Sequence, residues 1–248
     1  MSKLNKLITS WSPGQIHTTS YLTDQGYSSA LLAQYRKNNW IYSVGKGAVA
    51  RVGDSLDWRG GLVALQQELG LDVHLAAKSA LKLYGVSHFA RKNEVEFLFG
   101  SPGTRLPAWF QEAKWGTTVK FVTTNLFKTS LGLLRKSYDH FKVLSSCRER
   151  ALFEQLYLVP KHASFSESAH LFEGLHTLRS EIIETLLREC QSIKTKRLFM
   201  VVAEHLNYPW VSKLDLADID FGKGNRVIDE GGKTHPKYNI TVNDPFLF

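Results

Sequence analysis

Short segments separated by turn residues fill the first 51 residues, and their order restricts the possible folds more than any other feature of the chain. Apolar residues at helical spacing predict a first helix, which ends at Ser12-Pro13-Gly14. A second helix is predicted over residues 18–25, before Gly26, and a third over residues 28–38. Two short apolar segments then flank Gly45-Lys46-Gly47, which is typical of a β-hairpin. Three helices followed by a hairpin predict a winged helix-turn-helix.

The predicted third helix has two unlike faces. A rotation of about 100° per residue groups one set of residues that is expected to pack against the first two helices: Tyr27, Leu31, Gln34, Tyr35 and Asn38. The opposite side is expected to enter the major groove of DNA and carries Ser29, Leu32, Ala33, Arg36 and Lys37. Arg36 and Lys37 suit phosphates or guanine edges, and Leu32 suits a thymine methyl group.

Charge is concentrated in the same region. Residues 1–51 hold six of the 31 Lys and Arg residues and one of the 23 Asp and Glu residues, which leaves a nearly balanced 25 and 22 in the remainder. We expect the cations to contact phosphates, with Lys46 and Arg51 on the flanking backbone. The predicted DNA-binding residues are Thr18, Thr19, Ser28, Ser29, Leu32, Arg36, Lys37, Lys46 and Arg51.

Turn residues between Gly53 and Gly61 predict a domain junction, which gives a winged helix domain at 1–53 and a larger domain at 54–248. The larger domain is predicted to be mixed α/β and mainly helical, so the fold class is α+β. Its expected helices span residues 62–69, 75–84, 149–158, 167–175, 178–190 and 196–206. Strands are expected at 95–99 and 119–123, with turns and short strands in the last forty residues.

Composition limits location and chemistry. No apolar run approaches the roughly 20 residues that cross a bilayer, and the first residues lack a secretory apolar region. We therefore expect a cytoplasmic protein without membrane contact. Cys147 and Cys190 lie far apart and have no zinc-ligand spacing, so they are predicted to be buried thiols.

Three groups of residues are candidates for a catalytic site. Gly100-Ser101 resembles a nucleotidyltransferase phosphate loop, but the paired acids Asp218 and Asp220 lie far downstream, and Pro102-Gly103 favours a turn. Glu94 and Glu96 alternate on a predicted strand and suit an exposed face.

The spacing of the third group, His162, His170 and His176, is not that of a zinc hydrolase. The sequence predicts no catalytic residue, metal site or cofactor.

The chain resembles the AbiEi antitoxin family of type IV toxin-antitoxin systems over nearly its whole length. Residues 16–38 with Trp40-Ile41 and Lys46-Gly47 are similar to the winged helix of that family. Four later groups of residues follow in the family's order: Ala77-Lys78-Ser79-Ala80-Leu81 with Tyr84-Gly85, Glu149-Arg150-Ala151-Leu152-Phe153-Glu154, Lys196-Arg197-Leu198-Phe199, and Gly222-Lys223-Gly224-Asn225-Arg226 with Gly231-Gly232 and Tyr238-Asn239-Ile240-Thr241-Val242.

The resemblance implies a non-catalytic protein whose winged helix binds inverted repeats in its own promoter. It implies that the larger domain neutralises a nucleotidyltransferase-like toxin. Candidate toxin contacts are the basic Lys194, Lys196 and Arg197 and the acidic Asp215, Asp218 and Asp220. Two alternatives remain open at this point: a stand-alone winged-helix regulator with a ligand-sensing second domain, and a nucleic-acid-processing enzyme.

Overall fold

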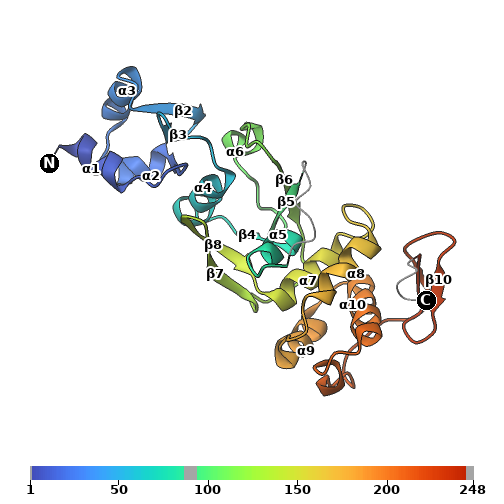
Figure 1. Ribbon diagram of the computed structural model, residues 1–248. Helices are drawn as coiled ribbons and strands as arrows, with labels where there is room; N and C mark the ends of the chain where they lie inside the picture. Colours follow the sequence, from blue (N-terminus) through green and yellow to red (C-terminus); the bar gives the residue numbers. More distant parts are fainter. Residues whose placement is uncertain (1, 87–93, 244–248) are drawn as a thin grey trace. The chain divides into compact units, whose positions relative to one another are not determined.

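The computed structural model describes residues 2–86 and 94–243 and shows an α+β fold (Figure 1). The chain divides into two compact units. Unit 1 comprises Met1–His74, Asn93–Thr123 and Arg135–Leu144, and unit 2 comprises Leu75–Lys92, Thr124–Leu134 and Ser145–Phe248, each in its described part. Residues 1–53 therefore share a compact unit with later segments, and a functional division after residue 53 stays a prediction.

Unit 1 begins with the three helices and the hairpin that the sequence predicts. These elements are α1 (Lys3–Ser10), β1 (Ile16–Thr18), α2 (Thr19–Asp24), α3 (Ser29–Lys37), β2 (Ile41–Gly45) and β3 (Ala48–Arg51). Strand β1, which the sequence analysis did not predict, pairs with β3 and completes a small sheet of order β1-β3-β2. The winged helix-turn-helix is thus confirmed as a fold.

Each of the three helices starts at a hydroxyl side chain that accepts a backbone N–H of the first turn. Ser2, Thr18 and Ser28 accept the N–H groups of residues 5, 21 and 31. Such caps satisfy donors that have no partner inside the helix. The helices and hairpin bury one apolar cluster: Leu7, Trp11, Leu22, Tyr27, Leu32, Tyr35, Ile41 and Val49.

The remainder of unit 1 contains short helices and part of a sheet. The elements that follow the hairpin are α4 (Trp58–Val63), the π-helical segment η1 (Ala64–Glu68), β4 (Val73–Leu75), β5 (Val95–Gly100), α6 (Ala108–Glu112), β6 (Thr118–Thr123), β7 (Leu133–Tyr138) and β8 (Phe141–Ser146). The sheet has the order β6-β5-β4-β8-β7, and β5 pairs in parallel with β6 over six residues. Strands β5 and β6 were predicted; β4, β7 and β8 were not.

Two contacts fasten the winged helix to the elements that follow it. The Glu68 carboxylate lies 2.5 Å from His17 Nδ1 and accepts the Thr18 N–H at 2.6 Å. The backbone of Gly60 in α4 lies so close to the loop before β1 that an added Cβ would stand 2.8 Å from the Cα atom of Gln15. Both contacts are buried inside unit 1. They hold the backbone at Gln15 and Thr18, and this fixes the position of β1 and of the cap of α2.

Unit 2 is mainly helical, and it contains the helices that the sequence predicts between residues 149 and 206. Its helices and strands are α5 (Ala77–Lys82), α7 (Arg148–Tyr157), α8 (Phe165–Glu173), α9 (Ser180–Glu189), α10 (Ile193–Leu206), the 3-10 segment η2 (Val211–Lys213), β9 (Arg226–Val227), β10 (Lys233–His235) and β11 (Ile240–Val242). Helix α7 packs against α5, α8, α9 and α10 (Figure 1). Phe153 of α7 stacks on Phe199 of α10 with ring centroids 4.1 Å apart, at the centre of the helical core.

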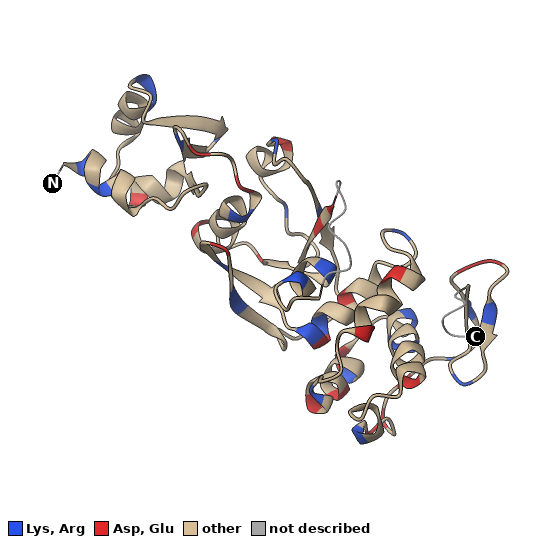
Figure 2. Ribbon diagram, in the orientation of Figure 1, with Lys and Arg blue, Asp and Glu red and all other residues tan. Residues whose placement is uncertain are grey.

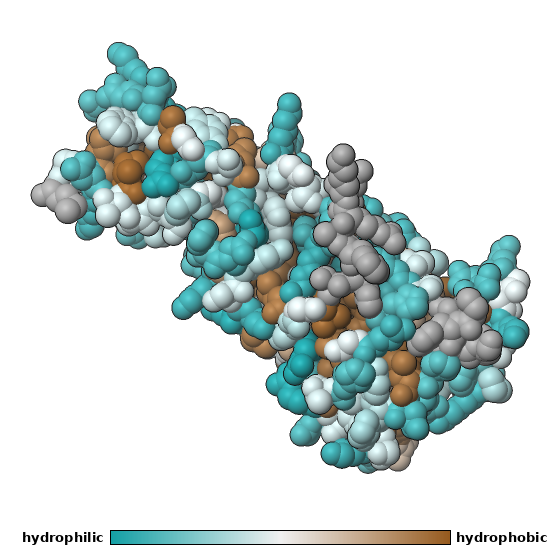
Figure 3. Space-filling model, viewed as in Figure 1, coloured by the Kyte–Doolittle hydropathy of each residue, from teal (hydrophilic) through white to brown (hydrophobic). Residues whose placement is uncertain are grey.

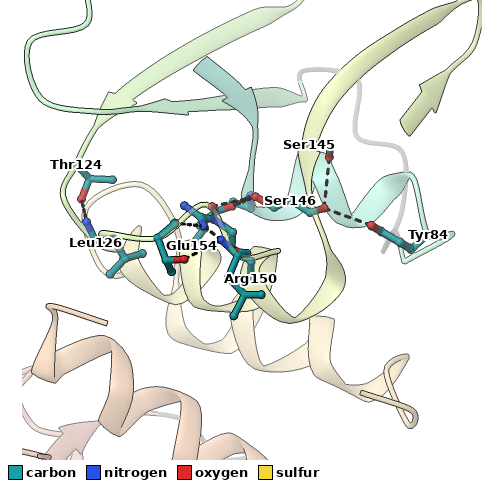
Figure 4. A network of polar contacts seen from close by, with 10 residues as sticks. Tyr84, Thr124, Leu126, Ser145, Ser146, Arg150 and Glu154 are labelled. Atoms are coloured by element: carbon teal, nitrogen blue, oxygen red, sulfur yellow. Dashed lines mark hydrogen bonds and ion pairs between the residues drawn. The ribbon is translucent and has the colours of Figure 1, made fainter. Parts of the chain in front are cut away.

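A buried polar network joins α5 to α7 (Figure 4). Glu154, which is 1% exposed, accepts the Ala77 N–H at 3.1 Å, the Ser146 hydroxyl at 2.7 Å and the Arg150 Nε–H at 3.0 Å. Arg150 also donates to the carbonyls of Thr129 and Leu131. A buried carboxylate needs such partners. The network also brings together two groups of residues that resemble the family, at 77–81 and 149–154.

Arg197 holds the last segments of unit 2 on α10. Its guanidinium donates to the backbone carbonyls of Phe221, Gly224 and Asn239, each at 2.7 Å. The neighbouring Lys196 donates to the carbonyl of residue 220 at 3.1 Å. Arg197 is 2% exposed and Lys196 5% exposed, so these cations serve the fold of the C-terminal segments.

The two cysteines are buried thiols without a disulfide, which confirms the prediction for both. Burial raises the pKa of Cys147 to about 11 and that of Cys190 to about 11. Both side chains are therefore protonated and unreactive near neutral pH.

Candidate nucleic-acid interface

Helix α3 presents a polar outer face. After Tyr27 the chain enters the helix at the Ser28 cap, and Leu32 and Tyr35 are buried against the core of the winged helix. The opposite side is exposed and carries Ser29, Ala30, Ala33, Gln34, Arg36 and Lys37. Small residues in the first turns and cations in the last turn suit a helix that approaches a DNA groove.

The wing places a lysine at its tip. Strands β2 and β3 pair antiparallel with an irregularity between Ser43 and Gly45, and the turn contains Gly47 at φ +88°. That backbone conformation strains residues with a side chain, so a glycine is suited to this position. Lys46 at the turn is exposed, as the sequence predicts.

The outer cations are free to bind phosphates. Within the described part of the chain, Arg36, Lys37 and Lys46 form no ion pair with a carboxylate. Figure 2 shows the basic residues at the end of α3, and Figure 3 shows a hydrophilic surface over the same end. Their charge is available to an anionic partner.

The predicted role of Leu32 is wrong. Its side chain is 2% exposed and belongs to the apolar cluster, so it does not face a groove. Tyr27 is buried but precedes the cap of α3, so it is not part of the helix. Gln34, which was assigned to the inner face, is exposed instead. Its amide is the group that pairs with adenine edges in the major groove.

Thr18 and Arg51 are also structural. Thr18 is 2% exposed, and its hydroxyl caps α2 while its N–H binds Glu68. Arg51 forms an ion pair with Asp54 at 2.9 Å and donates to the carbonyl of Trp11. Both side chains are used inside unit 1, which argues against the predicted DNA contacts.

Three predicted polar contacts remain near the outer surface. Ser29 is exposed, and Ser28 is exposed although its Oγ accepts the Leu31 N–H at 3.3 Å. The Ser28 hydroxyl hydrogen is still available as a donor. Thr19 is half-buried, and its N–H donates to the carbonyl of Gly47 in the wing turn at 2.9 Å.

The residues considered for catalysis have structural settings. Residues 102 and 103 form the turn that the sequence predicts, and the Ser101 hydroxyl donates to Asp72. Glu96 is buried, which corrects the expectation of an exposed strand face. His170 lies 3.0 Å from Glu173 on the same helix. In the described ranges, no group of His, Cys, Asp and Glu side chains has the arrangement of a metal site.

The predicted toxin contacts divide by burial. Lys196 and Arg197 are buried and bind backbone carbonyls, so their assignment to a partner surface is wrong. The acidic residues Asp215, Asp218 and Asp220 are exposed. Across residues 2–86 and 94–243, no helix combines the length and the apolar character that a membrane crossing requires.

A solved structure shares the overall fold of this chain. The crystal structure of the RV2827C protein from Mycobacterium tuberculosis aligns with a TM-score of 0.59 over 98% of this chain and 92% of that chain, at 14% sequence identity. This likeness shows a shared fold. No curated protein sequence matches the chain.

Two family models together cover almost the whole chain. Residues 1–91 match the N-terminal domain of the AbiEi antitoxin transcriptional regulators. Residues 93–243 match the model described as "Transcriptional regulator, AbiEi antitoxin, Type IV TA system". The chain therefore belongs to the AbiEi antitoxin family of transcriptional regulators of type IV toxin-antitoxin systems.

Proposed function

We propose that this protein represses its own operon by binding inverted repeats in the promoter through α3 and the wing. The observation that carries the proposal is a set of exposed cations on the winged helix, Arg36, Lys37 and Lys46, which form no ion pair with any carboxylate of residues 2–86 and 94–243. Cations supply the sequence-independent affinity for the phosphate backbone. In this proposal the protein acts on DNA in the cytoplasm.

Sequence readout rests on few side chains in this proposal. Ser29 and Ala33 are short and allow α3 to lie close to the base edges. Gln34 provides an amide for adenine, and Arg36 provides a guanidinium for guanine. Because the helix offers so few long polar residues, the shape of the operator contributes to its recognition.

The second activity in the proposal is neutralisation of a nucleotidyltransferase-like toxin by residues 54–248. The family to which the chain belongs is described as an antitoxin, and this description supports the proposal. Among the residues considered as toxin contacts, the exposed Asp215, Asp218 and Asp220 remain candidates. An acidic loop suits a basic partner surface.

DNA binding is tested with single alanine variants and a promoter fragment. Arg36→Ala and Lys46→Ala should each weaken binding by about tenfold, because each removes one contact to phosphate or base. Lys120→Ala is the matched control, since Lys120 is an exposed lysine on β6 and its removal should leave affinity unchanged. Equal affinities for all three variants and the wild type would exclude this surface.

Antitoxin activity is tested separately by co-expression with the neighbouring toxin gene under its own inducible promoter. The full-length double variant Arg36→Ala/Lys46→Ala should restore growth as well as the wild type does, while a promoter reporter is derepressed. Point variants are preferable to deletion of the winged helix. The deletion would remove His17 and Thr18, which bind the buried carboxylate of Glu68, and would leave that carboxylate without these partners. Growth arrest in the presence of the wild-type protein would show that the antitoxin proposal is wrong.

A further inference from the structure

Helix α10 carries three cations whose bonds go to backbone carbonyls rather than to carboxylates. The Lys194 ammonium donates to the carbonyl of Tyr157 at 2.9 Å and to that of Val159, and the bonds of Lys196 and Arg197 to carbonyls are given above. Within the described residues, no carboxylate forms an ion pair with any of the three. Carbonyls satisfy the N–H donors but carry no formal negative charge. The Lys194 ammonium also lies 5.5 Å from the centroid of the Tyr157 ring.

A fourth cation adds to this charge. Arg226 in β9 is exposed. Burial lowers the pKa of Arg197, and repulsion from Arg226 lowers it further, whereas Asp220 acts in the opposite direction. The carboxylate of Asp220 accepts the Gly222 N–H at 2.7 Å. Arg226 thus lies near Arg197, and Lys196 and Arg197 lie near Asp220. Positive charge of this kind favours an anion.

An open pocket of about 360 Å³ lies at these residues. Lys194 and Arg226 line it as cations, Asn125 and Gln191 as amides, and Tyr157 as an aromatic ring. Its volume is at the lower end of the range for small-molecule sites, which is about 300–1,000 Å³. All of these residues belong to unit 2, whereas α3 and the wing belong to unit 1.

We propose that this pocket binds a phosphate group, carried by a mononucleotide or by an inorganic polyphosphate, with Arg226 and Lys194 as its principal contacts. A guanidinium matches two phosphate oxygens with parallel N–H donors, and an ammonium adds a point charge. Lys194 has three N–H donors and uses two for carbonyls. The amides and the Tyr157 ring provide hydrogen-bonding groups and a stacking surface for a base.

The proposal is tested by isothermal titration calorimetry on the full-length protein in magnesium-free buffer at physiological salt. ATP and inorganic tripolyphosphate are the two probes. Arg226→Ala should weaken the binding of both by about tenfold or more. This variant keeps the fold, because the Arg226 side chain is exposed and the pairing of β9 uses the backbone N–H, which donates to Asn239. Arg226→Lys should retain part of the affinity.

Lys223→Ala is the matched control. Lys223 is an exposed cation three residues before Arg226 and does not line the pocket, so its removal should change affinity less than about twofold, as expected for screened surface charges. Equal affinity for the two probes would identify phosphate as sufficient, and tighter binding of ATP would identify a nucleotide; both support the site. Absence of binding, or equal losses in Arg226→Ala and Lys223→Ala, would overturn it.

Discussion

Glu149 is fully buried at the start of α7, and its carboxylate is held by Arg179. The Arg179 Nε and the backbone N–H donate to one oxygen at 3.0 Å, and Nη2 donates to the other at 2.8 Å. Burial alone would raise the pKa of Glu149, but these bonds outweigh it and lower the pKa to about 2. The ionised carboxylate is therefore the form that stabilises the folded state.

A pH dependence follows from this depressed pKa. The contribution of Glu149, about 3 kcal/mol, is fully present above the pKa of an unfolded glutamate, near 4.5, and is lost as pH falls towards about 2. In Arg179→Met burial dominates and the pKa of Glu149 rises. The stability difference between wild type and this variant should therefore shrink from pH 7 to pH 3, as measured by urea unfolding.

Arg188→Met serves as the control for that measurement. Arg188 forms a long surface ion pair with Glu184, at 3.7 Å, and such pairs contribute roughly 0–1 kcal/mol. The control should therefore show a small difference from wild type at both pH values. A difference between wild type and Arg179→Met that stays constant with pH would contradict the assigned role of Glu149.

Individual side chains show the limit of what the sequence predicts about the site. The exposed Arg36, Lys37 and Lys46 were predicted because helical rotation and the hairpin turn are local properties. Arg51 binds Asp54, three residues further on, a pairing that the sequence analysis did not weigh. Its other acceptors, the carbonyls of residues 8 and 11, lie far away in sequence. Lys196 and Arg197 were misassigned because their acceptors also lie far away in sequence, in the loop that folds over α10.

At the level of elements, close packing between α4 and the loop before β1 provides a test of the fold of unit 1. Gly60→Ala would bring a methyl group against the backbone of Gly14 and Gln15, and backbone atoms do not move aside as a side-chain end does. We expect a loss of about 1–3 kcal/mol, as for overpacked sites. Thermal unfolding of the full-length variant measures it.

Gly174→Ala is the comparison for Gly60→Ala. At Gly174 an added Cβ would stand 3.8 Å from a methyl group of Val86, which is ordinary contact. The substitution should change stability by less than about 0.5 kcal/mol. Equal losses for the two variants would show that α4 is not packed against the loop as described.

The predicted and missed elements differ in what stabilises them. Helices α7 to α10 were predicted because each has an apolar periodicity within its own segment. Strand β1 has three residues, all buried, and shows no alternation. Strand β4 is equally short, and its ladder to β8 pairs Leu75 with Ser145. Such strands depend on partners distant in sequence, which a local pattern does not reveal.

For the whole molecule, the strength of DNA binding should depend on salt in proportion to the number of outer cations. A protein cation that neutralises a phosphate releases a counterion from the DNA. Among the described residues of α3 and the wing, the exposed cations without an ion pair are Arg36, Lys37 and Lys46. Log affinity should fall with log salt concentration at a slope of about −1.8 per protomer if Arg36 contacts guanine, and of about −2.7 if all three cations contact phosphate. Fluorescence anisotropy of a labelled promoter fragment at a series of KCl concentrations measures the slope.

Lys46→Ala should make that slope less steep by about 0.9, because one phosphate contact is lost. Arg51→Ala should leave the slope unchanged, since Arg51 is bound to Asp54. A slope near −1 for the wild type, or equal reductions in the two variants, would contradict the interface described.

The outer face of α3 is chemically independent of the forces that hold the fold. Ser29, Ala30 and Ala33 are exposed, whereas the caps, the apolar cluster and the Glu68 contacts lie elsewhere. Substitutions at such positions change stability by less than about 0.5 kcal/mol. After gene duplication, substitutions at these positions can thus change the operator sequence that the protein recognises. The same fold can serve many promoters without loss of stability.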